Sequence, residues 1–310
     1  MGEAVTMWCD DLDAAVDALR TAGMRLDVIM PADAPAVAEL SANGVRVRVQ
    51  RRAEAAPPAT GRAGMIYRDL LPEREGGRFI ASHITIPDGG PVPDYVHHHD
   101  VRFQVIHCVR GWVRVVYEDQ GEPFTMHAGD TVLQPPHIRH RVLESSPGLE
   151  VFELTGPAEH PTFVEHDITL PTPNMRPERD FGGQRFVRHE LATATWTPWR
   201  ATPGFEAADT GIGVATSGLG GARTVRVTRA GAELVATRHD AELVLWFVET
   251  GTATVTVGVE RRTLTAGDAV AIPAGVELAL FDCTHDLTFY EVTVPAGPFA
   301  RPGTRSAHTA

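Results

Sequence analysis

The segment YVHHHDVRFQVIHCVRG, residues 95–111, places three consecutive histidines directly before a run of alternating character. Successive side chains of a β-strand point to opposite faces, so His97 and His99 share one face while His98 points to the other. A turn after Asp100 would bring the next strand back with Gln104 facing inward. The segment therefore predicts two imidazoles directed at one point, with a carboxamide near them.

A third histidine follows on a later strand. In HAGDTVLQPPHIRHRV, residues 127–142, a turn at Pro135 and Pro136 precedes His140. Together with His97 and His99, it would present three nitrogens on one face of an ion. Imidazole ligands suit Fe, Zn, Cu, Ni and Mn to different degrees.

The surrounding pattern occurs twice in the chain. From about Tyr67, short strands rich in Val, Ile, Thr and Phe are separated by Gly, Pro and Asp turns, which is typical of an antiparallel barrel or sandwich. VIHCVRGWVRVVY, HAGDTVLQPPHIRHRV and LEVFELTGP correspond to LWFVETGTATVTV, TAGDAVAIPAGVELAL and LTFYEVTVP. The offsets, 140 residues at Gly111/Gly251 and 138 at Gly129/Gly267, indicate an internal duplication.

These motifs resemble the cupin superfamily, whose first motif spaces Gly, His-x-His, Glu and Gly and whose second spaces Gly, Pro-x-Gly and His. The matching positions here are Gly90, His97, His99, Gln104, Gly111, Gly129, Pro135 and His140. The resemblance covers about residues 67–157 and again 196–297. It implies a mainly β protein with two tandem cupin (double-stranded β-helix) barrels. It also favours a metal site over the competing interpretation, a solvated histidine loop.

Gln104 stands where the family usually has glutamate. A neutral carboxamide is a weaker ligand than a carboxylate, so Gln104 would either coordinate weakly or orient other groups, and the ion would keep its full +2 charge. Such a site favours an anionic substrate. Arg102, on the same predicted face, could clamp the anion, although a salt bridge at the rim is an equal alternative.

The second barrel lacks the ligand set. The corresponding positions hold Thr237, His239, Val244 and Leu278, and one histidine does not hold a metal tightly. We therefore expect this barrel to be structural, with an apolar ligand pocket as the alternative.

Ahead of the barrels, residues 4–50 predict strand, helix and three strands, with an acidic cap before the helix and Gly23 after it. This βαβββ unit resembles a half-module of the glyoxalase and extradiol dioxygenase (vicinal oxygen chelate) superfamily, without its metal ligands. The expected domains are the half-module at 1–53, a linker at 54–63, the metal-binding cupin at 64–157, a connector at 158–195, the degenerate cupin at 196–297 and a tail at 298–310.

Composition excludes several classes of function. Among 310 residues every basic residue is arginine, which rules out lysine Schiff bases and a P-loop lysine. The net charge of −12, without a basic patch, argues against nucleic acid as a partner. Three widely spaced cysteines indicate a reducing compartment. Without a membrane-length apolar run or a signal peptide, we expect no membrane partner and a cytoplasmic location.

The resemblance to bicupin oxygenases implies a non-haem Fe(II)-dependent dioxygenase acting on a small anionic substrate, with an aromatic acid among the options. His97, His99 and His140 would be ligands, Gln104 a weak ligand or orienting group, and Arg102 the anion clamp. A non-oxidative isomerase or lyase, or a binding protein without catalysis, stays open, as do Zn, Mn, Ni and Cu. A lone βαβββ unit leaves a sheet edge, so we expect a homodimer or larger homo-oligomer.

Overall fold

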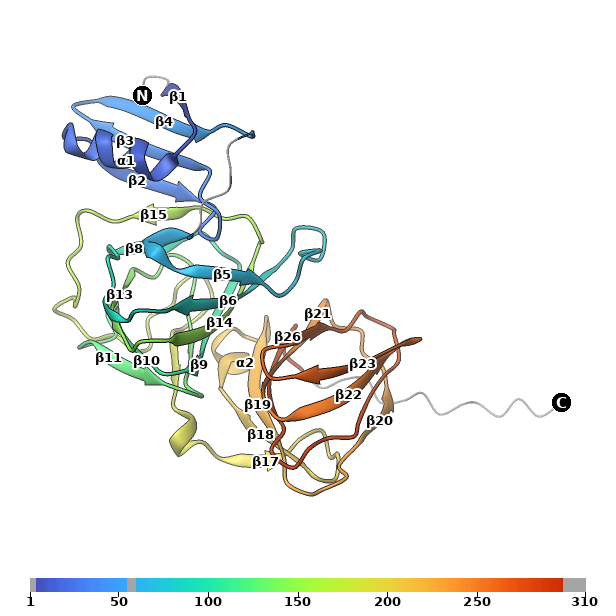
Figure 1. The fold of residues 1–310 in the computed structure, drawn as a ribbon. Coiled ribbons are helices and arrows are strands. Elements are labelled where there is room, and N and C mark those ends of the chain that lie inside the picture. Colours follow the sequence, from blue (N-terminus) through green and yellow to red (C-terminus); the bar gives the residue numbers. More distant parts are fainter. Residues whose placement is uncertain (1–3, 55–59, 298–310) are drawn as a thin grey trace. The chain divides into compact units, whose positions relative to one another are not determined.

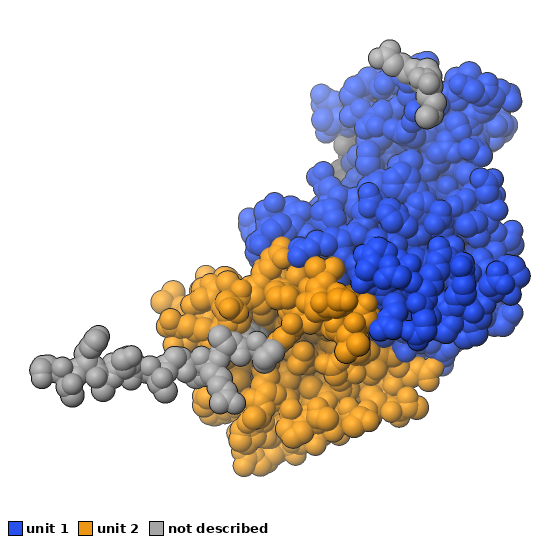
Figure 2. Space-filling view, turned by 180° about the vertical axis from the view of Figure 1, so that it is seen from behind, with its two compact units in different colours: residues 1–188 blue, residues 189–310 orange. Residues whose placement is uncertain are grey.

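The computed structural model describes residues 4–54 and 60–297 and divides the chain into two compact units, Met1–Arg188 and His189–Ala310 (Figures 1 and 2). The boundary between the units falls inside the predicted connector. The predicted tail and residues 55–59 of the predicted linker lie outside the described residues, as do residues 1–3 of the half-module.

The first unit begins with the expected βαβββ module. Its elements are β1 (Val5–Cys9), α1 (Leu12–Thr21), β2 (Arg25–Met30), β3 (Val37–Ala42) and β4 (Val45–Arg51). Asp11 caps the helix by accepting a 3.0 Å hydrogen bond from the backbone N–H of Ala14. Leu12 and Val16 of α1 are buried against the sheet, which runs in the order β1-β4-β3-β2.

A strand of the predicted connector joins this module to the first barrel. β15 (Thr162–Val164) pairs with β2 on one side and with the histidine strand on the other, so one sheet runs through both parts (Figure 1). His166, just beyond β15, lies 2.7 Å through Nε2 from the backbone oxygen of Leu26. The β2 edge of the module is therefore covered by the chain itself.

The first barrel consists of two facing sheets whose side chains meet in one core. One sheet runs β8-β13-β10-β11, with β7 beside β13, and the other runs β16-β12-β9-β14-β6-β5. A short 3-10 helix, η1 (Arg62–Gly64), precedes the barrel. Its strands are β5 (Ile66–Asp69), β6 (Ile80–Ile86), β7 (Gly90–Pro91), β8 (His97–His99), β9 (Phe103–Arg110), β10 (Trp112–Tyr117), β11 (Phe124–His127), β12 (Thr131–Leu133), β13 (His140–Ser145), β14 (Leu149–Gly156) and β16 (Val187–His189).

The second unit repeats this plan. Its sheets run β17-β18-β19-β26-β21-β24 and β20-β25-β22-β23. It also contains η2 (Leu191–Thr193) and α2 (Ile212–Ala215). Its strands are β17 (Trp196–Pro198), β18 (Phe205–Asp209), β19 (Gly221–Val227), β20 (Leu234–Thr237), β21 (Leu243–Thr250), β22 (Thr252–Val257), β23 (Glu260–Thr265), β24 (Ala269–Ala271), β25 (Leu278–Phe281) and β26 (Thr288–Val294).

Strand register confirms the duplication that the sequence predicts. In the first barrel His97 of β8 lies opposite His140 of β13. In the second barrel the corresponding positions, Thr237 of β20 and Leu278 of β25, lie opposite each other in the same way. Gly111 and Gly251 both adopt positive φ angles, 78° and 72°, at equivalent turns, a conformation that glycine adopts without strain. Residues of one barrel can therefore be compared position by position with those of the other.

Ion pairs hold residues 172–179 of the connector against the first barrel. Arg179 lies 2.7 Å from carboxylate oxygens of both Glu118 and Asp119, and Arg176 also pairs with Asp119. Burial alone would raise the pKa of Asp119, but hydrogen bonds from Arg179, Thr172 and Arg176 hold it below its usual value. This part of the connector is thus bound to the barrel that carries the histidines. Over the described residues, no helix combines the length and hydrophobicity that crossing a membrane requires.

Candidate metal centre

His97, His99 and His140 converge in the first barrel, as the sequence predicts. Each offers a ligand atom, and these three atoms lie within 4.8 Å of one another. All three side chains are buried, with residue exposures of 0%, 5% and 5%. His97 and His99 share a face because β8 alternates, and His140 joins them as the cross-strand partner of His97. In the part of the chain that the structure describes, this is the one such cluster of His, Cys, Asp or Glu.

The outer nitrogens of the three rings are held by neighbouring groups. Nδ1 of His97 lies 2.8 Å from the backbone oxygen of Tyr95, and Nδ1 of His140 lies 2.9 Å from that of Ile138. Nδ1 of His99 lies 3.4 Å from Oγ1 of Thr162 on β15. An Nδ1–H that donates to such an oxygen leaves Nε2 with the lone pair that a metal requires. The donor set therefore fits a divalent transition metal, which is the conclusion that the sequence supports.

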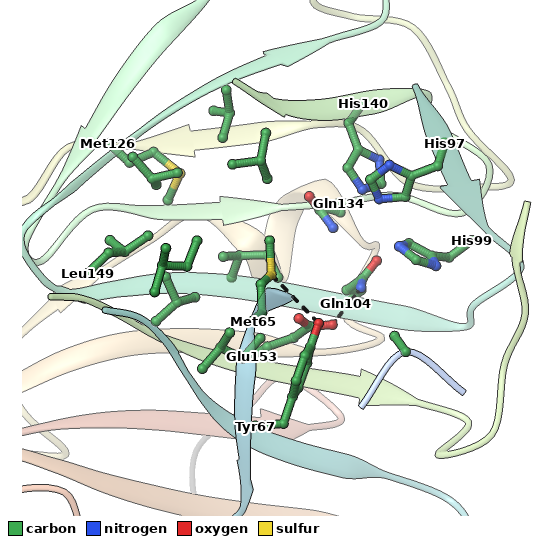
Figure 3. Close-up of a pocket in the computed structure, with 18 of the residues that line it drawn as sticks. Met65, Tyr67, His97, His99, Gln104, Met126, Gln134, His140, Leu149 and Glu153 are labelled. Atoms are coloured by element: carbon green, nitrogen blue, oxygen red, sulfur yellow. Dashed lines mark hydrogen bonds between the residues drawn. The ribbon is translucent and has the colours of Figure 1, made fainter. Parts of the chain in front are cut away.

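The histidines form one end of a cavity inside the barrel (Figure 3). Most of the cavity wall is apolar and comes from both sheets. The apolar lining residues are Ala32, Met65, Ile84, Ile86, Ile106, Val113, Val115, Met126, Val142, Leu149 and Val151. An apolar cavity with a few convergent polar groups is typical of a site for a small organic ligand.

The polar part of the wall includes Gln104 and a carboxylate that the sequence analysis missed. Gln104 is 2% exposed and donates through Nε2 to Oε1 of Glu153 over 2.8 Å. The hydroxyl of Thr155 donates to the same oxygen over 3.0 Å. Glu153 returns a negative charge close to the centre, so the expectation that the site keeps the undiminished +2 charge of the ion is corrected. Its position was recognisable, since LEVFELTGP and LTFYEVTVP carry glutamate at the same place on a strand that alternates toward the core.

A second carboxylate, Asp94, lies 3.6 Å through Oδ1 from Nδ1 of His97, whereas Tyr117 and Cys108 are neutral. Tyr117 lies in the wall and donates its hydroxyl hydrogen to Oε1 of Gln134 over 2.6 Å. Burial, with the nearby charge of Glu153, raises the pKa of Tyr117, so the phenol stays protonated. Cys108 belongs to the apolar core of this barrel, and burial raises the pKa of its thiol to about 12. Cys108 is thus a small core residue rather than a nucleophile.

Arg102 is not brought to the cavity. It lies in the bend before β9, its side chain is exposed, and it is not among the cavity-lining residues. Its backbone N–H donates to the oxygen of Gly156, and its own carbonyl accepts from Gln184. The prediction that Arg102 faces inward assumed strand alternation one residue before the strand begins. The described lining contains no arginine, so an anion would depend on the metal for its counter-charge.

The N-terminal module contributes to the lining of the same cavity. Ala32, in the loop between β2 and β3, lines it together with Tyr67 and His160. Asp33 of this loop pairs with Arg74 of the barrel over 2.9 Å. A Cβ on Gly61 would approach the Ala32 oxygen to 2.6 Å, which shows how closely the segments pack. The module therefore takes part in shaping the cavity.

Neither His98 nor His239 of the second barrel is placed to bind a metal. His98 points away from the centre and stacks on Phe163 with ring centroids 5.2 Å apart. In the second barrel His239 is buried, with Nε2 3.0 Å from the Ile272 oxygen and Nδ1 accepting the N–H of Ala241 over 3.2 Å. Val244 and Leu278 belong to the apolar core there. Both nitrogens of His239 thus serve backbone groups, consistent with a structural barrel.

Comparison with known proteins places the fold. Residues 225–287, in the second barrel, match the family model described as "Cupin domain". No curated protein matches the chain. A mutant of Bacillus subtilis oxalate decarboxylase superposes with a TM-score of 0.56 and 14% identity, covering 76% of this chain and 74% of that chain.

Two further solved structures have similar scores. The Lactobacillus farciminis oxalate decarboxylase formate complex gives a TM-score of 0.55 and 15% identity, covering 76% of this chain and 83% of that one. A mutant of salicylate 1,2-dioxygenase from Pseudoaminobacter salicylatoxidans gives 0.53 and 18%, covering 70% of each chain. Identities this low show the fold alone. The chain therefore has the fold of two tandem cupin barrels preceded by a small βαβββ module, with a three-histidine centre in the first barrel.

Proposed function

We propose that the first barrel is a non-haem Fe(II)-dependent dioxygenase that acts on a small anionic substrate with an apolar, aromatic body. The observation that carries this proposal is the position of His97, His99 and His140 at the polar end of an otherwise apolar cavity. Three neutral imidazoles add no charge to a divalent ion, so the centre stays positive even with the Glu153 carboxylate nearby and attracts an anion. The apolar wall then suits the rest of an aromatic acid.

The proposed metal is iron, although the donor set would also accept Zn, Mn, Ni or Cu. A bound ferrous ion would supply the redox chemistry with dioxygen that protein side chains lack. The chain itself binds and orients the substrate. Apolar walls from both sheets exclude water, and the ring of Tyr117, whose centroid lies 5.5 Å from that of His140, borders the polar end.

A metal-dependent lyase is the second candidate. It is favoured by Glu153, a carboxylate in the cavity that could exchange a proton with a substrate, and by the likeness in fold to oxalate decarboxylase structures. A substrate as small and polar as oxalate would leave most of the apolar wall without contacts. For that reason we rank the oxygenase first.

Oxygen consumption separates these functions. Protein loaded anaerobically with Fe(II) is mixed with salicylate and related hydroxybenzoates, and dioxygen uptake, carbon dioxide release and product are measured. We expect turnover only after dioxygen is admitted, with one dioxygen consumed per product. Turnover without dioxygen would favour the lyase, and stoichiometric binding with no product would indicate a binding protein.

We further propose that residues 1–53 are a half-module of the glyoxalase type and that the chain forms a homo-oligomer through it. The β2 edge is covered by β15, but β1 ends the sheet within this chain. Val5, Met7 and Trp8 on β1 are exposed by 59%, 44% and 55%. A second copy could bury this apolar edge. Light scattering should report at least a dimer, and a monomer at high concentration would refute the proposal.

A further inference from the structure

Glu153 occupies a position that the second barrel also fills with glutamate, but its environment differs. Glu153 lies opposite Ile106 across the β14-β9 pair, and Glu291 lies opposite Trp246 across the equivalent β26-β21 pair. Glu291 follows Glu153 by 138 residues, the same offset that separates Gly129 from Gly267. The two environments therefore show what each barrel uses this carboxylate for.

In the second barrel the carboxylate is neutralised inside the core. Glu291 is 0% exposed, pairs with Arg200 and, over 3.4 Å, with Arg223. The indole N–H of Trp246 donates to it over 2.8 Å. Arginine and tryptophan donors on every side are typical of a structural buried ion pair.

In the first barrel the positions of Trp246 and Arg223 hold residues that cannot donate in the same way. Ile106 stands in the position of Trp246. The position of Arg223 is taken by Ser82, which lies opposite Glu153 as Arg223 lies opposite Glu291. The hydrogen bonds that reach Glu153 come from Gln104, at a predicted ligand position, and from Thr155. The carboxylate is thus connected to the histidine centre instead of to an arginine pair.

An ionised carboxylate can only accept hydrogen bonds, so it dictates which end of the Gln104 amide faces it. The nitrogen must point to Glu153, and the oxygen then lies on the side of the three histidines (Figure 3). Oxygen and nitrogen of an amide are nearly equal in size, so without this contact the group could turn over. An NH₂ group directed at a cation would be repelled, whereas the oxygen can coordinate it or hydrogen-bond to a bound water.

We propose that Glu153 is a positioning residue that locks the Gln104 amide with its oxygen toward the metal, which makes Gln104 a weak fourth donor. This inference rests on the proposed metal centre. In most cupins a single carboxylate stands at the position of Gln104. Here the Gln104 amide would supply the donor oxygen, and the Glu153 carboxylate would lie one hydrogen bond farther from the ion. The centre keeps four potential donors without a carboxylate directly on the ion.

The test compares metal binding by four proteins: the unmodified chain, Glu153→Leu, Gln104→Glu and the exchange variant Gln104→Glu/Glu153→Gln. Mn(II) and Co(II) affinities of the metal-free chains are measured by calorimetry, and the visible spectrum of the Co(II) form reports coordination. Glu150→Gln, on the outward face of the same strand, is the matched control. Thermal melts confirm that each variant is folded.

We expect Glu153→Leu to weaken Co(II) binding by about tenfold or more, the usual effect of losing a group that orients a ligand, and to change the Co(II) spectrum. Gln104→Glu alone should bind less tightly than the exchange variant, because it places two carboxylates at the 2.8 Å contact. The exchange restores one N–H donor and one acceptor, so its affinity should equal or exceed that of the unmodified chain.

Two results would overturn the proposal: an unchanged affinity and spectrum in Glu153→Leu, or a Gln104→Glu variant that binds as tightly as the exchange variant. Failure of the unmodified chain to bind either metal would instead refute the metal centre on which the proposal rests. The two failures are therefore distinguishable without an activity assay.

Discussion

Replacing His97, His99 or His140 with alanine is expected to abolish stoichiometric metal binding and all metal-dependent turnover. Each imidazole is one of three convergent donors, and each ring is oriented by a contact between its Nδ1 and a nearby oxygen atom. Losing a donor should cost at least about 100-fold in affinity, more than the roughly 10–100-fold typical of outer partners. Metal content after gel filtration and calorimetric affinity measure the effect.

The second barrel provides the control for this experiment. His239→Ala alters the histidine that corresponds to His99, but both nitrogens of His239 contact backbone groups. Its metal content should equal that of the unmodified chain, although we expect the variant to lose some stability. Retention of full metal content by two of the three alanine variants of the first barrel would contradict the three-histidine centre.

Filling the cavity is expected to weaken substrate binding strongly while leaving the metal in place. Ile106 lines the cavity, and the equivalent residue of the second barrel is Trp246, which belongs to a filled core. Ile106→Trp would place an indole in the space proposed for the substrate ring. Excluding an aromatic ring from this wall forfeits roughly 1.5–3 kcal/mol of apolar burial, which corresponds to about 10–100-fold weaker binding.

Calorimetry with salicylate as probe, paired with metal analysis, measures the two effects separately. The second barrel accommodates its tryptophan through an N–H bond to Glu291, so an indole opposite Glu153 has a comparable acceptor. Ile106→Leu keeps the volume and should bind the probe as the unmodified chain does. Unchanged salicylate affinity in Ile106→Trp would mean that the substrate binds elsewhere.

The metal ligands could be predicted from sequence because their positions follow from local geometry. Alternation on one strand places His97 and His99 together, and the repeated motif spacing identifies the strand that carries His140. The loss of the site from the second barrel followed from the same frames. Short, regular strands with glycine turns leave few alternatives for register.

Strand alternation and motif spacing do not predict the positions of residues that depend on contacts between distant segments. Arg102 was assigned by extending alternation into a turn, where the alternation does not hold. Ala32 reaches the cavity only because β15 pairs with β2, a contact between strands more than 130 residues apart. Glu153 was visible as a repeated inward glutamate, but its hydrogen bond to Gln104 requires the pairing of β14 with β9.

Metal analysis of the unmodified protein tests the central claim most directly. The chain is produced with Fe(II), Mn(II) and Zn(II) supplied, purified, and measured for transition metal per polypeptide by elemental analysis. The structure predicts one ion per chain, since the described residues bring three ligands together once, in the first barrel. Two ions per chain, or none, would contradict it.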